Sequence, residues 1–171
     1  MVKAVAFFKR RPGMAVEEFQ DYWRSRHPEV VTRLPGVRRY VQSHTRPAAY
    51  RKGEPIYDGI AELWFDDTAA MHTLRDTPEM AAVQADEARF IDRSTMNLII
   101  TDEHVIKDGP VPPGAAKAIG FVRRRPGMPV EAFQRHWQEV HGPLGAAILT
   151  MRRYVGRFRD PSRAGVCDRR R

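Results

Sequence analysis

Apolar positions change their spacing along the first half of the chain, and each change predicts a different element. Residues 2–9 are mostly apolar, with β-branched and aromatic members, and Arg-Arg-Pro-Gly follows them. This pattern is typical of a strand that ends in a turn. From Ala15 to about Arg33 the pattern recurs every three or four positions, and at about 100° per residue it places one buried stripe along a helix. The stripe comprises Val16, Phe19, Gln20, Trp23, His27 and Val30.

The middle of this half predicts two further strands and the loop between them. Residues 37–45 alternate between two chemically different faces, and Tyr40 and His44 share one of them. Residues 46–55 contain Pro, Gly and charged side chains and predict a loop. Residues 56–65 predict another strand, which ends at Asp66.

Two short helices and a last strand complete the unit. Asp67 precedes a helical stretch that runs to about Arg75, and Thr77 precedes Pro78 at the start of another. Residues 97–107 predict the final strand. The order β-α-β-β-α-β predicts an α+β fold, namely a ferredoxin-like βαββαβ unit whose antiparallel sheet carries both helices on one face.

The chain then repeats itself at a constant offset of 114 residues. Residues 4–41 align without a gap onto residues 118–155, and a repeat of this length indicates a duplicated domain rather than a short solenoid unit. The matched pairs include Phe7/Phe121, Phe19/Phe133, Gln20/Gln134, Trp23/Trp137, His27/His141 and Tyr40/Tyr154.

This repeat predicts four parts. Residues 1–108 form a complete domain, residues 109–116 a Pro/Gly linker, residues 117–158 a partial second copy, and residues 159–171 a basic, disordered tail. The short second copy is either native or the product of a frameshift, and both alternatives stay open.

The partial copy predicts only strand, helix and strand (β-α-β). In a ferredoxin-like sheet the third strand lies between the first and the second, and the partial copy has no third strand. The predicted strands 117–123 and 151–158 must therefore pair directly, leave a gap or borrow a strand from elsewhere.

The net charge of +8 does not indicate a polyanion site, because it is unevenly distributed. Residues 1–108 carry 16 basic and 17 acidic side chains, whereas residues 109–171 carry 13 and 4. RNA-recognition modules with this fold carry a basic-Gly-aromatic run on the third strand, and residues 56–63 have none. We therefore expect no nucleic-acid partner.

Composition narrows the location. The chain is 42% hydrophobic and 29% charged, and no apolar run approaches the roughly 20 residues of a membrane span. The N-terminus lacks the pattern of a secretory signal, and the single cysteine, Cys167, can form no internal disulfide. We expect a cytoplasmic protein with no membrane partner.

The motifs Arg10-Arg11-Pro12-Gly13-Met14, Trp23, His27-Pro28 and Arg38-Arg39-Tyr40 resemble the EthD family, one of the dimeric α+β barrel families. The second copy carries them as Arg124-Arg125-Pro126-Gly127-Met128, Trp137, His141 and Arg153-Tyr154. The resemblance covers the first copy and reaches Val155 in the second.

This resemblance implies two ferredoxin-like sheets packed face to face in a barrel, with a ligand cavity between sheet and helices. It also implies a homodimer through residues 1–108, a small aromatic or polyketide-like ligand and no bound cofactor. EthD proteins are associated with oxidoreductase systems, and relatives of the barrel type act as cofactor-free decarboxylases, cyclases, isomerases or monooxygenases.

Three residues are candidate catalytic groups: His27, Tyr40 and His141. An imidazole on an apolar helix face titrates near neutrality and can act as a general acid or base. The alternative is structural, because each histidine precedes a Pro or Gly-Pro and so lies near a helix end. Tyr40 either orients a substrate oxygen or is a core tyrosine with a satisfied hydroxyl.

Further side chains are candidates for the wall of the ligand pocket. They are Gln20, Trp23, His44, Glu62, Trp64, Trp137 and Tyr154. No histidine pair has the spacing of a metal site, so no metal is expected.

Two functions remain. One is an enzyme that needs no bound cofactor and uses a histidine as acid or base. The other is a non-catalytic dimerising accessory protein of an oxygenase system.

Overall fold

The computed structural model describes residues 1–158. The chain divides into two compact units, Met1–Ile100 and a second that begins at Thr101. The division falls within the strand β4 (Ile91–Asp108), so this strand contributes residues to both units. The predicted basic tail, 159–171, and Cys167 lie outside the described residues.

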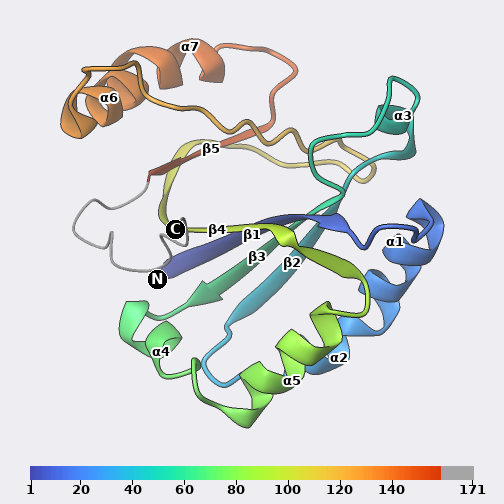
Figure 1. The fold of residues 1–171 in the computed structure, drawn as a ribbon. Coiled ribbons are helices and arrows are strands. Elements are labelled where there is room, and N and C mark those ends of the chain that lie inside the picture. The colour runs from blue at the N-terminus through green and yellow to red at the C-terminus, as the bar shows by residue number, and fades with distance from the viewer. Residues whose placement is uncertain (159–171) are drawn as a thin grey trace. The chain divides into compact units, whose positions relative to one another are not determined.

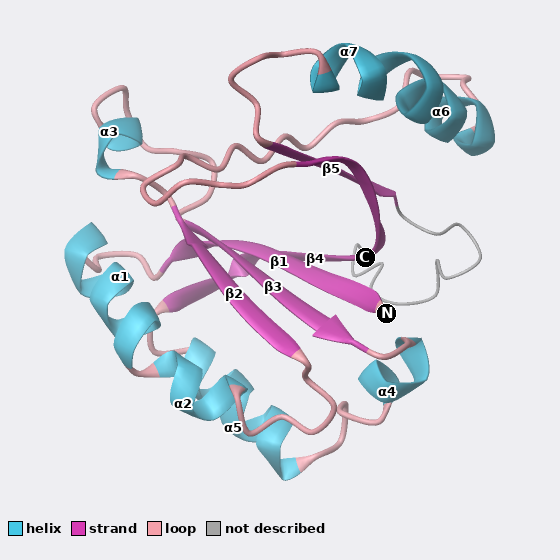
Figure 2. Cartoon of the chain, turned by 180° about the vertical axis from the view of Figure 1, so that it is seen from behind, coloured by secondary structure: helices cyan, strands magenta, loops and turns pink. Residues whose placement is uncertain are grey.

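The first unit is a ferredoxin-like α+β fold, as the sequence pattern predicts. Its sheet has the order β2-β3-β1-β4, and β3 pairs antiparallel with both β1 and β2. Figures 1 and 2 show α1, α2 and α5 on one face of this sheet. The elements are β1 (Val2–Arg10), α1 (Val16–Ser25), α2 (His27–Val31), β2 (Arg39–His44), α3 (Pro47–Tyr50), β3 (Gly59–Phe65), α4 (Thr68–His72), α5 (Pro78–Glu87) and β4 (Ile91–Asp108).

The helix expected over residues 15–33 is divided in two at Arg26. Pro28 has no backbone N–H and its ring excludes the carbonyl one turn earlier, so it suits the first turn of a new helix better than the middle of a long one. The predicted buried stripe persists across the break, since Phe19, Trp23 and His27 are all buried.

Both predicted helix caps form. The Asp67 carboxylate accepts a hydrogen bond from the Ala70 N–H at 2.8 Å, and the Thr77 hydroxyl accepts one from the Met80 N–H at 3.2 Å. Two other expectations need correction. Residues 46–55 include the short helix α3, and the third strand begins at Gly59 rather than residue 56.

Side chains of the sheet and helices form two apolar clusters. One contains Phe8, Phe19, Trp23 and Phe90, and Tyr40 packs against it. Alternate residues of each strand face the helices, which is why Ala4, Ala6 and Phe8 enter the clusters while Lys3 and Val5 lie on the other face of the sheet.

The second unit repeats part of the first. It contains α6 (Val130–His136), a π-helical turn η1 (Trp137–His141), α7 (Gly142–Ala146) and β5 (Arg153–Phe158). At the offset of 114, β5 corresponds to β2, but it pairs antiparallel with residues 102–108 of β4. Of the three arrangements expected for the partial copy, the borrowed strand is the one observed.

The predicted strand at 117–123 does not form. Residues 117–123 have no regular secondary structure, and none of the described strands pairs with them. The strand β5 pairs with β4 instead.

Candidate functional site

Four of the predicted site residues meet between the first two helices and β2. The Trp23 Nε1–H donates to the Tyr40 hydroxyl oxygen at 2.9 Å. The ring of His44 lies 4.3 Å from that of Trp23, and the rings of His27 and Tyr40 lie 6.3 Å apart. The buried stripe of the helices faces one face of β2, and this brings Trp23 and His27 close to Tyr40 and His44.

The fifth member of this group, Asp86 on α5, was not among the sequence candidates. Its Oδ2 lies 2.7 Å from His27 Nδ1, and its Oδ1 accepts a hydrogen bond from the Tyr22 hydroxyl at 2.6 Å. Asp86 is 59 positions from His27, and no local pattern connects the two. Only the packing of α5 against α2 brings them together.

The carboxylate of Asp86 sets the state of His27. A carboxylate accepts hydrogen bonds, so His27 carries its proton on Nδ1 and has a lone pair on Nε2. Nε2 has no hydrogen-bond partner within residues 1–158. Burial lowers the pKa of His27, which is 4% exposed, although the hydrogen bond that His27 donates to Asp86 and the negative charge of that carboxylate oppose the shift. At neutral pH this histidine is therefore an uncharged base.

Tyr40 is held as an uncharged phenol. Burial raises its pKa to about 12, while hydrogen bonds from Gln42 and Trp23 oppose the shift. Gln42 Nε2 donates both to the Tyr40 hydroxyl oxygen at 3.1 Å and to the Trp23 carbonyl at 2.6 Å. Gln42 shares its strand face with Tyr40 and His44, so the alternation along β2 was a signal for it.

His44 is also uncharged at neutral pH. Its Nε2 lies 3.0 Å from Gln42 Oε1, and burial lowers its pKa to about 4, with the positive charge of Arg24 acting in the same direction. Its Nδ1 is buried and has no hydrogen-bond partner among the described residues.

Gln20 supports the site from one side. Its Nε2 donates to the Thr45 carbonyl at 2.8 Å and ties α1 to the end of β2. The structure thus gives this predicted pocket residue a backbone partner.

Glu62 and Trp64 lie on the other face of the sheet and are not brought together with His27. In the strand pairing Glu62 is opposite Val41, whereas Tyr40 is opposite Leu63. Glu62 is 0% exposed, and its carboxylate accepts a hydrogen bond from Lys3 Nζ at 3.0 Å. The same ammonium lies 3.9 Å from the centre of the Trp64 ring.

The second unit repeats the ring geometry of the first. The rings of His141 and Tyr154 lie 6.5 Å apart at 76°, against 6.3 Å and 73° for His27 and Tyr40. Trp137 lies 4.5 Å from His141. His141, however, is exposed. No carboxylate accepts a hydrogen bond from His141 within the described part of the chain, whereas Asp86 lies 2.7 Å from His27.

Glu87 adds a second carboxyl group beside Asp86. Burial raises its pKa to about 7, with a further contribution from Asp86 and an opposing one from Arg93. A folded-state pKa above the unfolded value means that the stabilising, protonated form is present at low pH and is lost as the pH rises through 7.

Glu87→Gln is therefore expected to stabilise the protein at pH 8, by about 1 kcal/mol, and to leave it nearly unchanged at pH 5. Urea unfolding at the two pH values measures this, with Glu79→Gln in the first turn of α5, where the side chain is partly exposed, as the control. An equal effect of Glu87→Gln at both pH values would contradict it.

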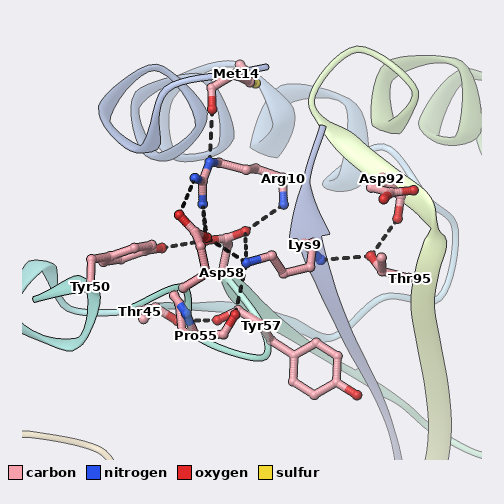
Figure 3. Close-up of polar contacts among 11 residues, drawn as sticks. Lys9, Arg10, Met14, Thr45, Tyr50, Pro55, Tyr57, Asp58, Asp92 and Thr95 are labelled. Atoms are coloured by element: carbon pink, nitrogen blue, oxygen red, sulfur yellow. Dashed lines mark hydrogen bonds and ion pairs between the residues drawn. The ribbon is translucent and has the colours of Figure 1, made fainter. Parts of the chain in front are cut away.

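The Arg-Arg-Pro-Gly-Met motif has a structural role in the first unit (Figure 3). Arg10 Nε donates to the Met14 carbonyl at 2.9 Å, and Arg10 Nη1 lies 2.7 Å from Asp58 Oδ1. Hydrogen bonds from Arg10 and Lys9 lower the pKa of Glu54 to about 2. A cavity of about 240 Å³ lies beside these side chains. The negative charges of Glu54 and Asp92 in its wall offset the positive charges of the lysine and arginines there, so the cavity is not favourable for binding an anion.

Between residues 1 and 158, no three His, Cys, Asp or Glu side chains converge as a metal site would require. No helix in the same range has the length and apolar character needed to cross a membrane.

Residues 11–94 and 125–170 match the family model of the EthD domain. The match covers most of the chain and falls on both copies of the repeat, so the chain belongs to the EthD family. No curated protein sequence matches the chain significantly.

Several solved structures are similar to this one. An EthD family protein from Bacillus halodurans is 22% identical, with a TM-score of 0.48 over 60% of this chain and 97% of that chain. HapK from Hahella chejuensis is 14% identical, with a TM-score of 0.45 over 70% and 100%. SnoaB from Streptomyces nogalater, described as a cofactor-independent oxygenase, is 16% identical, with a TM-score of 0.42 over 58% and 88%.

Proposed function

We propose that this EthD protein binds a small aromatic or polyketide-like molecule beside His27 and Tyr40 and catalyses a proton transfer without a bound cofactor. The observation that carries the proposal is the buried, uncharged His27, which Asp86 orients at 2.7 Å and whose Nε2 has no partner among the described residues. This arrangement is that of a general base with an orienting carboxylate.

The residues have complementary roles. Nε2 of His27 accepts a proton from an acidic C–H or phenolic O–H of the ligand, and the imidazolium that forms is stabilised by the Asp86 carboxylate. The Tyr40 hydroxyl donates a hydrogen bond to the ligand oxygen on which negative charge develops. The rings of Phe19, Trp23 and Phe90 lie close to these groups and favour an aromatic ligand.

A test uses deuterium exchange, because base-catalysed proton abstraction from an aromatic ketone incorporates solvent deuterium next to the carbonyl. A panel of aromatic ketones that includes 2-acetylnaphthalene is incubated with the protein in D₂O and followed by NMR. His27→Asn is expected to lower the exchange rate about a hundredfold, and Asp86→Asn to lower it less, since the base remains.

The control is His72→Asn, which replaces an exposed histidine on α4. With this variant the ketone should exchange at the same rate as with the unaltered protein. Thermal melting shows whether each variant is folded. If no ketone in the panel exchanges faster with the unaltered protein than with His27→Asn, catalysis is contradicted and the accessory role becomes the better account.

We also propose that the protein forms a homodimer through residues 1–108. This dimer follows from the family's dimeric barrels and from the ferredoxin-like sheet of the first unit. Sedimentation velocity over a range of concentrations tests it, and a mass of one chain at every concentration would contradict it.

A further inference from the structure

The side-chain amide of Gln42 can have only one orientation. The nitrogen assigned as Nε2 lies 2.6 Å from the Trp23 carbonyl oxygen. If the amide were turned over, two oxygens would face each other at that distance with no hydrogen between them. The amide oxygen of Gln42 must therefore point towards His44.

That orientation decides the tautomer of His44. Gln42 Oε1 can only accept, so the His44 Nε2 at 3.0 Å must carry the hydrogen. The lone pair is then on Nδ1, which is buried without a partner among the described residues. A buried acceptor without a donor costs free energy, and such groups in native structures call for an explanation.

Gln42 also restricts the direction in which the Tyr40 hydroxyl can donate its hydrogen. The phenolic oxygen already accepts hydrogen bonds from Gln42 Nε2 at 3.1 Å and from Trp23 Nε1 at 2.9 Å. Both of its lone-pair positions are occupied, so its own hydrogen must point to a third group. No side chain or carbonyl in residues 1–158 accepts that hydrogen. Tyr40 is thus a donor, as His44 is an acceptor.

The second copy lacks this device. At the offset of 114, the positions of Gln42 and His44 are taken by Gly156 and Phe158, while those of Trp23 and Tyr40 keep Trp137 and Tyr154. Glycine and phenylalanine have neither a side-chain amide nor an imidazole, so these two positions cannot make the hydrogen bonds of Gln42 and His44. The arrangement belongs to the first unit alone.

We propose that Gln42 sets the hydrogen-bonding polarity of the first-unit site, so that it selects hydroxylated aromatic ketones. The ligand hydroxyl donates to Nδ1 of His44, and the ligand carbonyl accepts from the Tyr40 hydroxyl. The ring of Trp23, against which His44 lies, is a wall for the aromatic part. This inference rests on the proposed function, because it names the class of ligand for that same site.

Two matched probes test the class of ligand. They are 6-acetyl-2-naphthol and its methyl ether, which differ only in the hydroxyl hydrogen and one methyl group. Fluorescence titration of the full chain is expected to give at least tenfold tighter binding of the naphthol. His44→Phe keeps a ring against Trp23 but removes the acceptor, and it should bind the two probes with similar affinity.

His72→Phe, on the exposed side of α4, should keep the preference for the naphthol. Equal affinity of the two probes for the unaltered protein would overturn the proposal, and so would a preference that survives His44→Phe. Absence of binding by both probes would overturn the ligand class.

The role of Gln42 is tested by ¹⁵N NMR of the imidazole nitrogens, which needs no ligand. His44 is expected to show a protonated Nε2 and an unprotonated Nδ1, and Nδ1 should shift when the naphthol is added. In Gln42→Glu a carboxylate replaces the amide that donates to Tyr40. The Tyr40 hydroxyl is then expected to donate its hydrogen to this carboxylate, and the negative charge beside His44 is expected to raise the pKa of His44.

A protonated Nδ1 in the unaltered protein would overturn this role. The two proposals also fail separately. Naphthol preference without ketone exchange would contradict the catalytic proposal alone, and exchange that depends on His27 without naphthol preference would contradict this one.

Discussion

Replacing Asp58 by alanine is expected to lower the free energy of unfolding by about 3 kcal/mol. Asp58 is 0% exposed and accepts hydrogen bonds from Arg10 Nη1 at 2.7 Å, from the Arg10 backbone N–H at 2.9 Å and from the Tyr50 hydroxyl at 2.6 Å. Without this carboxylate the Arg10 backbone N–H and the Tyr50 hydroxyl lose their acceptor, while the Arg10 guanidinium keeps Glu54 at 2.9 Å. Removing one partner of a buried charged network costs several kcal/mol. Figure 3 shows these groups converging on the carboxylate.

The matched control is Asp66→Ala. Asp66 also pairs with an arginine, Arg38, but both side chains are more than half exposed, and such surface pairs contribute at most about 1 kcal/mol. Asp58→Asn keeps the shape of the side chain and separates charge from packing. Urea unfolding gives the three values, and an Asp58→Ala loss no larger than that of Asp66→Ala would contradict the assigned role.

Gly59→Ala is expected to destabilise the protein by about 2–3 kcal/mol and to disturb the site. A Cβ atom on Gly59 would lie 2.4 Å and 2.8 Å from two ring carbons of Trp23 and 3.2 Å from Phe8. The Trp23 ring cannot move freely, because it is fully buried and its Nε1–H is bonded to Tyr40. Part of the strain should therefore appear as a broken Trp23–Tyr40 hydrogen bond, seen as a shifted indole N–H signal in NMR.

A double-mutant cycle separates this clash from any effect of alanine on the backbone. Trp23→Phe removes the ring atoms that the new Cβ would meet, so adding Gly59→Ala to it should cost clearly less than adding it to the unaltered protein. Gly120→Ala is the control, since nothing lies within 4 Å of its added Cβ. Additive effects of Gly59→Ala and Trp23→Phe would show that the contact is not the cause.

Much of the first unit follows from local patterns. The stripe of residues 16–30 and the alternation along β2 suffice to place Trp23, His27, Tyr40 and His44 on facing surfaces, and the caps at Asp67 and Thr77 mark two helix starts. The sequence left open whether a helix ends near His27, and the structure shows that α1 ends at Ser25 and α2 begins at His27, with Pro28 in its first turn. The length of β4 and the absence of a strand at 117–123 depend on which strands pair with one another. The pattern of residues within one segment does not specify its pairing partner.

The sequence by itself determined the family, the order of the elements in the first unit and the residues that the helical stripe turns towards the sheet, because these depend on short-range periodicity and on an internal repeat. Only the tertiary structure decided that Asp86 orients His27, that Gln42 fixes His44 and Tyr40, that Glu62 and Trp64 lie on the opposite face from Tyr40, and that β5 pairs with β4. Each of these depends on contacts between segments distant in the chain or on the direction of a side chain, and hydrogen bonding and packing select them only once the chain has folded.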